Sequence, residues 1–352
     1  MVHRRERALA VAEAAGAASL AVSGTAAVTW LTGHVPDIET GPSPFALAPI
    51  AVLAPGRRPI LVVSEDEEEP AAATGCDVAA YPGFGIGPVD PVASAADALK
   101  GALEGSPVAI DAGAFPAALA SDLEWVDVGA ELAKARAVKD PDEIALVREA
   151  IAVCDAGQAA ARAAAEPGMT ELELWALTRA EMERTAGGRL PVLADLVSGP
   201  RTTEVGGPPG TRVLQEGELV LCDLVPRVAG YWGDSCATFV LGDPSTAARS
   251  AHSRARDVLA AVLAEIRPGV VAGELDALAR SRMSFPHHTG HGLGAAWHEE
   301  PRIVPDAPAR LEENMVIAIE PGSYAEVGVR VEQAVLVTEE GCEVLSGHDL
   351  SL

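Results

Sequence analysis

Lysine is scarce in this acidic chain of 352 residues, which has only Lys100, Lys134 and Lys139. Lys and Arg together number 26 against 51 Asp and Glu, and the net charge is −25. Such an excess of negative charge argues against nucleic acid and anionic membrane surfaces as partners. It does not restrict the substrate, because bound metal ions can invert the local field of a site.

Long apolar runs and paired cysteines are also missing. No run reaches the ~18 consecutive apolar residues of a membrane-spanning helix. The five cysteines are odd in number and include no Cys-x-x-Cys motif, which favours reduced thiols in a cytoplasmic protein. The first residues, MVHRRERALAV, superficially resemble a secretion signal, but Glu13 interrupts the apolar region. We therefore expect a helix over about Arg4 to Ala15, followed by a strand near Ser19 to Val22.

Nearly half of the residues, 49%, are hydrophobic, which is typical of a globular chain long enough for two domains. Residues 1–135 alternate short apolar strands with Ala-rich helical stretches, the pattern of an α/β domain. Residues 136–352 open with helix signals: Asp140 precedes Pro141, and Thr170 precedes a second helical pattern that Gly187 ends. From Val192 onward the pattern is mainly that of strands, with one more helix expected from about Ser245 to Glu265.

Four carboxylates interrupt apolar, strand-like runs in the last third of the chain. An isolated buried charge is expensive, and no lysine and few arginines lie nearby in sequence to neutralise these groups. Metal ions are the simplest explanation. The four residues are Asp223, Asp234, Glu320 and Glu332.

The four carboxylates fall into two hairpins. If the first hairpin turns near Val228 and Ala229, Asp223 lies directly opposite Asp234. Two like charges in facing positions destabilise a sheet unless a cation lies between them or they share a proton. The alternative is a bulge in the hairpin that directs one of the two Asp side chains to solvent. Glu320 and Glu332 occupy facing positions in the second hairpin.

Four of the eight histidines fall within twelve residues between these hairpins: His287, His288, His291 and His298. The glycines beside His291 allow the backbone to approach closely and leave its imidazole room to reach an ion. Four carboxylates and one imidazole suit two divalent ions, with Mn²⁺ first and Co²⁺, Zn²⁺ or Fe²⁺ as alternatives. Two such ions ~3.5–4 Å apart would hold a bridging hydroxide directed at a carbonyl carbon.

This pattern resembles the pita-bread metallohydrolases, the group of methionine aminopeptidase, aminopeptidase P, prolidase and creatinase. The resemblance covers nearly the whole chain, since AVTWLTGH resembles the creatinase/prolidase N-terminal domain and VKDPDEIALVREA the entry to the catalytic domain. It implies an α/β N-terminal domain over 1–135 and an α+β pita-bread catalytic domain over 136–352, with a curved, mainly antiparallel sheet. Members with the extra domain are often homodimers, and we expect one here.

The resemblance also assigns roles, residue by residue. His287 and His298 match histidines that position substrate and stabilise the tetrahedral intermediate, and Arg330 matches an arginine that supports the site. Glu320 would also transfer the proton of the bridging water. The residues that match the five metal ligands are Asp223, Asp234, His291, Glu320 and Glu332, with Asp234 and Glu332 as the bridging pair.

The chain departs from the family pattern around the first hairpin. Peptidases of the family usually place a histidine in an SGxNxxLPHG segment, where this chain has Gly206 in SGPRTTEVGGPPG. The usual SDxTRT is GDSCATF, and RIED is RVEQ with Gln333 in place of the acid. None of these changes removes a ligand, but they put Xaa-Pro specificity in doubt.

Three functions remain open. The first is hydrolysis of a peptide amide bond by an Xaa-Pro aminopeptidase or dipeptidase. The second is hydrolysis of a small non-peptide amide, as creatinase and ectoine-type hydrolases perform; the complete ligand set argues against creatinase itself, whose chemistry does without metal. The third is a non-catalytic binding protein, which the five intact ligands disfavour.

Overall fold

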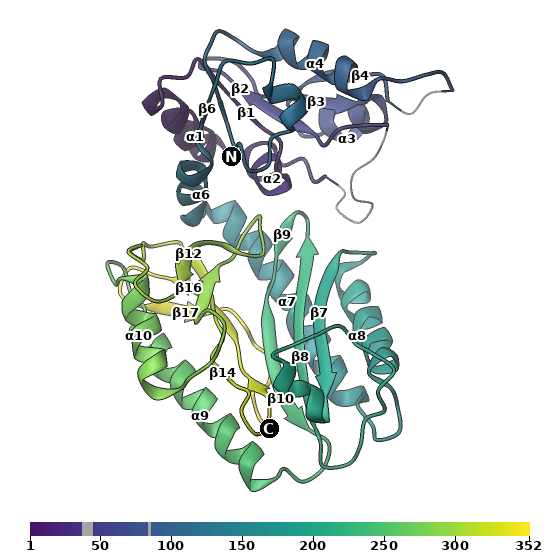
Figure 1. Ribbon diagram of the computed structural model, residues 1–352, viewed down its shortest axis with the longest axis vertical. Helices are drawn as coiled ribbons and strands as arrows, with labels where there is room; N and C mark the ends of the chain where they lie inside the picture. Colours follow the sequence, from purple (N-terminus) through teal and green to yellow (C-terminus); the bar gives the residue numbers. More distant parts are fainter. Residues whose placement is uncertain (37–44, 84–85) are drawn as a thin grey trace. The chain divides into compact units, whose positions relative to one another are not determined.

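The computed structural model describes residues 1–36, 45–83 and 86–352, and the chain divides into two compact units. The first unit is Met1–Arg136 and the second is Ala137–Leu352 (Figure 1). Each unit has its own sheets and its own apolar core. Within the described parts of the chain, no helix has the length and apolarity needed to cross a membrane.

A six-stranded mixed sheet forms the centre of the first unit. Its order is β4-β3-β2-β1-β5-β6, with β1 antiparallel to β2 and parallel to β5. The expected strands form it because they are short, aliphatic and almost completely buried. The strands are β1 (Ser19–Val22), β2 (Ile50–Leu53), β3 (Ile60–Ser64), β4 (Asp77–Tyr81), β5 (Val108–Ile110) and β6 (Trp125–Asp127).

Helices alternate with these strands, which confirms the α/β prediction for this unit. Leu99 of α4, for example, packs in one core with Val62 and Ile110 of the sheet. The N-terminal helix begins two residues earlier than expected and is followed by β1, as predicted. The helices are α1 (Val2–Ala14), α2 (Thr25–Thr32), the 3-10 turn η1 (Glu65–Glu67), α3 (Glu68–Ala72), α4 (Pro91–Ala102), α5 (Ala117–Ala120) and α6 (Gly129–Ala137).

All strand pairing in the second unit is antiparallel. One sheet has the order β10-β8-β7 with β9 on β8, another the order β12-β11-β13-β16-β17, and β14 pairs with β15. The strands are β7 (Val192–Ser198), β8 (Leu219–Val228), β9 (Tyr231–Trp232), β10 (Ser235–Val240), β11 (Gly290–Gly292), β12 (Glu299–Ile303), β13 (Val316–Ile319), β14 (Gly322–Ser323), β15 (Val329–Arg330), β16 (Gln333–Val337) and β17 (Cys342–Val344).

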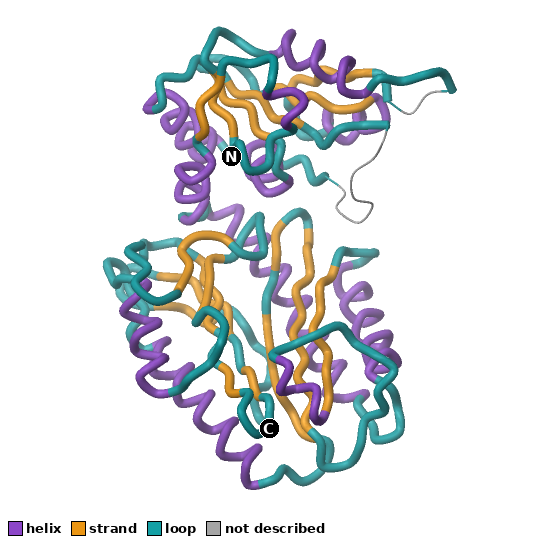
Figure 2. The backbone as a smooth tube through the Cα atoms, in the orientation of Figure 1, coloured by secondary structure: helices purple, strands orange, loops and turns teal. Residues whose placement is uncertain are grey.

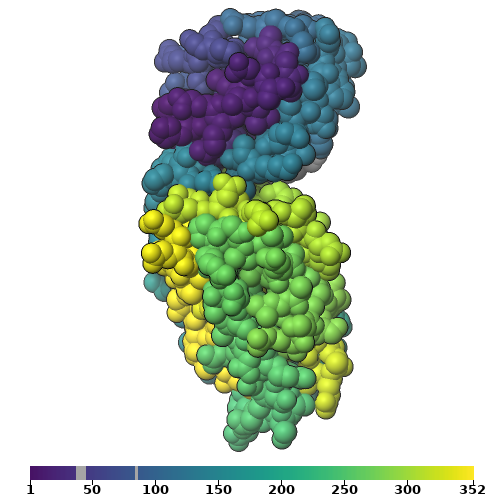
Figure 3. All heavy atoms as spheres, turned by 90° about the vertical axis from the view of Figure 1, so that its left-hand side faces the viewer, coloured from purple at the N-terminus to yellow at the C-terminus, as the bar shows by residue number. Residues whose placement is uncertain are grey.

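Two pairs of helices cover these sheets (Figure 2). Leu174 and Met182 pack with Leu224 on the first sheet, whereas Val258 packs with Ile317 on the second. Residues of the second pair also form part of the outer surface seen in Figure 3. The helices are α7 (Pro141–Ala164), α8 (Glu171–Ala186), α9 (Thr246–Leu263) and α10 (Ala272–Arg282), with the 3-10 turn η2 (Gly199–Glu204) after β7.

The helix boundaries follow the predicted signals. The Glu143 side chain accepts the backbone N–H of Asp140 at 2.9 Å, a capping-box bond that fixes the start of α7. Thr170 accepts the backbone N–H of Glu173 at 3.2 Å at the start of α8. Gly187 ends α8 in the left-handed conformation, with φ of 78°.

The first carboxylate hairpin has a different register from the predicted one. Asp223 pairs with Cys236, not with Asp234, which lies just before β10. The turn consists of Ala229 and Gly230, one residue later than expected. Both have positive φ, 48° and 88°, as a two-residue hairpin turn of type I′ requires.

This correction moves the pairing by two residues, and a shift of two leaves every side chain on its original face of the sheet. Asp223 and Asp234 are therefore diagonal neighbours on one face. The predicted register of the second hairpin is correct. Ile319 pairs with Gln333, and β14 and β15 continue the same register beyond them, so Glu320 and Glu332 lie at facing positions.

Candidate metal centre

The second unit contains a cavity of about 420 Å³ that is lined by every residue predicted for the site. The residues come from both sheets and from the loops between their strands. The predicted residues in the cavity wall are Asp223, Asp234, His287, His291, His298, Glu320, Arg330 and Glu332.

Asp223 faces a carboxylate that the sequence analysis did not include. Asp195 of β7 is its direct cross-strand partner, so two like charges lie side by side. Arg330 bridges them, since its Nη2 donates to Asp223 and lies 3.3 Å from Asp195 Oδ2. Burial raises the pKa of Asp223 to about 7. The positive charge of Arg330 opposes this rise, and the negative charge of Asp195 adds to it.

Arg330 is itself almost completely enclosed. Two more of its nitrogens donate to protein acceptors: Nη1 to the Val205 carbonyl at 3.1 Å and Nε to the Cys236 sulfur at 3.4 Å. Burial acts against its charge, but Asp223 holds the pKa of Arg330 well above its ordinary value. The guanidinium therefore positions Asp223 and directs four of its five N–H donors to protein acceptors.

Asp234, His291 and Glu332 form one compact group of potential ligands. One donor atom from each lies within 4.8 Å of the others, and all three side chains are buried. Burial together with the neighbouring carboxylates raises the pKa of both Asp234 and Glu332. His291 Nδ1 lies 2.9 Å from the Gly292 carbonyl, which fixes the ring with Nε2 towards the carboxylates.

Glu320 approaches the same nitrogen of His291 as Asp234 does, with Oε1 3.6 Å from Nε2 against 3.5 Å for Asp234 Oδ2. Glu320 Oε1 also lies 2.6 Å from His288 Nε2. Burial opposes the ionisation of Glu320, but the bond with His288 and the charge of Arg330 outweigh it and lower the pKa of Glu320 to about 2. Glu320 is therefore the predicted ligand whose pKa is lowered, whereas the pKa values of Asp223, Asp234 and Glu332 are raised.

The two histidines predicted to act on substrate, His287 and His298, differ in the hydrogen-bond partners of their rings. Both ring nitrogens of His287 have protein partners at 2.8 Å, the His288 carbonyl and the Tyr324 hydroxyl. His298 is exposed and stacks on Trp297, with ring centroids 4.7 Å apart. Burial and the neighbouring His291 lower the pKa of His298 to about 4, so its ring is neutral near pH 7. His298 is the histidine with a ring free to meet a ligand.

The charge balance of the cavity tests whether metal ions fit it. Five carboxylates line it against a single guanidinium, that of Arg330. Asp223 Oδ1 and Glu332 Oε1 are buried without a hydrogen-bond partner, a costly state for an ionised carboxylate. Burial lowers the pKa of His291, so its imidazole is neutral, as a metal ligand requires. Oxygen-rich donors with one neutral imidazole fit divalent ions of the first transition row.

Sequence reasoning missed two residues in this cavity, Asp195 and His288. Asp195 interrupts the apolar run of β7 in VLADLVSG, the same signal that identified Asp223. His288 belongs to the noted histidine cluster but had no assigned role. Its donor atom also lies within 4.8 Å of those of His291 and His298.

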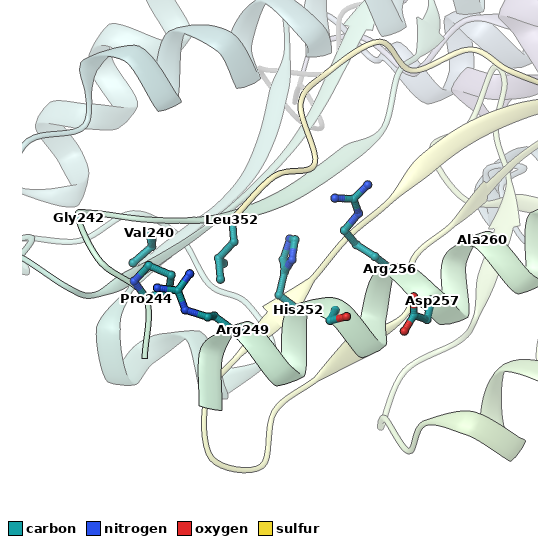
Figure 4. Close-up of a pocket in the computed structure, with 10 residues that line it drawn as sticks. Val240, Gly242, Pro244, Arg249, His252, Arg256, Asp257, Ala260 and Leu352 are labelled. Atoms are coloured by element: carbon teal, nitrogen blue, oxygen red, sulfur yellow. The ribbon is translucent and has the colours of Figure 1, made fainter. Parts of the chain in front are cut away.

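A second cavity of about 520 Å³ lies along α9 in the same unit (Figure 4). Its charged side chains, Arg249, Arg256 and Asp257, are exposed, and His252 is its one buried ionisable residue. None of the carboxylates predicted as ligands lines it. The predicted ligands therefore lie in the first cavity and not in this one.

Comparison with known proteins agrees with this architecture. Residues 145–339 match metallopeptidase family M24, and residues 4–138 match the creatinase/prolidase N-terminal domain. The chain is therefore a member of metallopeptidase family M24, with the fold of a two-domain prolidase. The prolidase from Pyrococcus horikoshii OT3 has this fold, with a TM-score of 0.86, 24% identity and 99% of both chains covered.

Two bacterial sequences illustrate the similarity further. "Probable dipeptidase PepE" of Mycobacterium tuberculosis (strain ATCC 25618 / H37Rv) is 34% identical over 261 residues, 71% of this chain and 67% of PepE. "Uncharacterized peptidase YqhT" of Bacillus subtilis (strain 168) is 31% identical over 235 residues, 64% of this chain. That alignment spans 66% of the length of YqhT, just under two thirds.

Proposed function

We propose that this protein hydrolyses the amide C–N bond of an Xaa-Pro peptide and uses two divalent metal ions, Mn²⁺ first among them. The observation that carries the proposal is the excess of buried carboxylates over cations in one cavity, two of whose carboxylate oxygens have no partner. Membership of family M24 and the dipeptidase and prolidase names of its relatives support the same reaction.

Five residues would hold the ions: Asp223, Asp234, His291, Glu320 and Glu332. When bound, the ions would supply a hydroxide at neutral pH and polarise the scissile carbonyl. Asp234 and Glu332 each have an oxygen within 4.8 Å of a ring nitrogen of His291, and the three residues would hold an ion together. The side chains of these ligands come from the two carboxylate hairpins and from the histidine segment between them.

The chain's own acid–base groups complete the reaction. The Glu320 carboxylate would accept the proton of the attacking water. His288 donates to Glu320 Oε1 at 2.6 Å and holds it in place. His298 offers a neutral N–H to the developing oxyanion. His287, bound to Tyr324, positions this group of side chains, and Arg330 orients Asp223.

A second candidate is the hydrolysis of a small non-peptide amide. Its support is local: Gly206 stands where the family's peptidases usually have a histidine, and the Asp195 carboxylate fills the adjacent space. A changed polar group beside the metal ligands is a physical reason to expect a changed substrate.

We further propose residues 1–135 as the N-terminal domain and 136–352 as the catalytic domain of a cytoplasmic homodimer. All five cysteines are free, and four are buried, which favours a reducing compartment. The dimer is an expectation from the family resemblance.

Elemental analysis of the purified protein tests the central proposal. We expect near two metal equivalents per chain, cleavage of Xaa-Pro dipeptides, and loss of both in Asp234→Ala. Two metals with turnover of ectoine-like amides only would favour the second candidate. A folded wild type that binds no Mn²⁺ on dialysis would overturn the metal centre itself.

A further inference from the structure

Asp195 is the fifth carboxylate of the cavity and has no place among the proposed ligands. It lies on β7 directly opposite Asp223, so its side chain is on the same face of the sheet. Its side chain is 37% exposed and lines the cavity, whereas that of Asp223 is 13% exposed. Asp195 therefore sits at the accessible edge of the site, beside a buried ligand.

The charge of Asp195 is only partly neutralised by the protein. Its Oδ2 lies 3.3 Å from Arg330 Nη2, and the same Nη2 donates to the more deeply buried Asp223. One guanidinium thus serves two carboxylates. In the part of the chain that the structure describes, Asp195 Oδ1 has no hydrogen-bond partner, and Arg330 is the only Lys or Arg in the cavity wall.

Gly206 leaves the space that the Asp195 carboxylate occupies. A Cβ placed on Gly206 would collide with Asp195 Oδ2 and crowd the rest of the carboxyl group. The φ of Gly206 is outside the left-handed region, so space, not backbone conformation, is what requires glycine here. A side chain at 206 and a carboxylate at 195 are alternatives, and this chain has the carboxylate.

Apolar side chains line the same cavity as the Asp195 carboxylate. Leu193, two residues before Asp195 on the same face of β7, is 42% exposed, and Trp297 is 38% exposed. Pro208 and Val225 also line the cavity. With the other four carboxylates assigned to metal ions, Asp195 is the carboxylate left in this cavity to bind an alkylammonium, whose methylenes would contact the apolar lining.

We propose that Asp195 is a specificity-determining residue that binds a positively charged nitrogen of the substrate at the edge of the metal centre. This inference rests on the proposed hydrolysis for its reaction and adds the charge of the group that is recognised. The nitrogen is either the α-ammonium or a basic side chain of the residue before the scissile bond, and both present the same chemistry to Asp195.

Substrate pairs that differ only in charge test this proposal in the metal-loaded protein. Lys-Pro against norleucine-Pro tests the side chain, and norleucine-Pro against its N-acetyl form tests the α-amine. In Asp195→Asn we expect the ratio of kcat/KM, charged over neutral, to fall roughly ten- to hundredfold for one of the pairs. Most of that change should be in KM.

Glu265→Gln is the matched control, because Glu265 lies outside the cavity, is 55% exposed and pairs with Arg267. It removes one negative charge and should leave both ratios unchanged. An equal fall for charged and neutral substrates in Asp195→Asn would assign Asp195 to positioning Arg330 instead and would overturn the proposal. Metal content is measured in each variant. A loss of metal in Asp195→Asn would likewise assign Asp195 to positioning Arg330 and would overturn the proposal.

A binding measurement separates this proposal from the proposed reaction. Calorimetry with n-hexylammonium and with n-hexanol on the Mn²⁺-loaded protein requires no turnover. We expect the ammonium to bind more tightly than the alcohol, and this preference to disappear in Asp195→Asn. If the protein prefers the ammonium but does not cleave Xaa-Pro peptides, the role of Asp195 is supported and the proposed reaction is wrong. If it cleaves them but shows no such preference, the reaction is supported and the role of Asp195 is wrong.

The geometry has its own test in a double-mutant cycle. Gly206→Ala should lower the melting temperature in the wild-type background, because its Cβ collides with the Asp195 carboxylate. In the Asp195→Ala background the same substitution should cost much less. Equal costs in the two backgrounds would show that the carboxylate does not occupy this space.

Discussion

The two carboxylate hairpins place their acids by different means. In the second hairpin Glu320 and Glu332 face each other. The strand pairs on either side of them, β13 with β16 and β14 with β15, share one register. In the first, Asp223 faces Asp195 and Cys236, and Asp234 lies outside the ladder. The second hairpin thus pairs its own two acids, whereas the first depends on β7 and on a cation from the second hairpin, Arg330 of β15. The first hairpin should therefore be the more sensitive to substitutions elsewhere.

Removal of one acid from each hairpin should have the largest effect. Asp234→Ala and Glu332→Ala each remove a proposed ligand that has an oxygen within 4.8 Å of a ring nitrogen of His291. We expect either to lower kcat/KM for an Xaa-Pro dipeptide at least about 1,000-fold and to reduce bound metal. Steady-state kinetics and elemental analysis check this. A variant with full metal content and activity would remove its residue from the ligand set.

Replacement of Arg330 tests whether the first hairpin depends on a cation from the second hairpin. Arg330→Met leaves Asp195 and Asp223 facing each other without a cation, and we expect the free energy of unfolding of the metal-free protein to fall by about 3 kcal/mol. The control is Arg148→Met, because Arg148 pairs with Glu343 at 2.6 Å on the surface with both side chains over 40% exposed. It should cost under about 1 kcal/mol. Urea unfolding of both variants measures the difference, and equal losses would contradict the bridging role.

Removal of metal should make stability depend on pH in a specific direction. Burial raises the pKa of Asp223 to about 7 and that of Asp234 and Glu332 above their ordinary values. A carboxyl whose pKa is raised on folding contributes stability below its unfolded pKa of ~4 and loses that contribution as pH rises through the folded value.

The site histidines act in a different window. Burial lowers the pKa values of His287, His291 and His298, so these three reduce stability only as pH falls below ~6.5. Between pH 6.5 and 8 the carboxyls alone change charge, and the melting temperature of chelator-treated protein should fall by roughly 3–5 °C. Mn²⁺ should abolish the fall, and a flat profile without metal would count against the buried acid cluster.

The turn of the first hairpin should give the smallest effect. Ala229 has a φ of 48°, a left-handed conformation that costs a residue with a Cβ more than it costs glycine. Ala229→Gly should raise the free energy of unfolding by about 0.5 kcal/mol, whereas Ala229→Val should lower it. Thermal unfolding of the two variants checks the sign, and the opposite order would mean that the turn has a different conformation.

Sequence reasoning was most successful where local chemistry decides the structure. The starts of α7 and α8 follow from Asp140 and Thr170, because a cap satisfies backbone groups within four residues of itself. It failed at Ala229 and Gly230, since nothing in the alternation of apolar residues distinguishes two turns one position apart. The error did not alter the face on which Asp223 lies, because a shift of two residues preserves it.

The sequence by itself determined the chemistry of the centre, because carboxylates in apolar strands and histidines among glycines carry their cost and their reactivity in any fold. Only the tertiary structure decided how those groups are neutralised. Arg330 lies 135 residues from Asp195 in the chain, and Gly206 leaves room for a carboxylate eleven residues before it. Charge pairing and close packing depend on distance in space, which the order of residues does not contain.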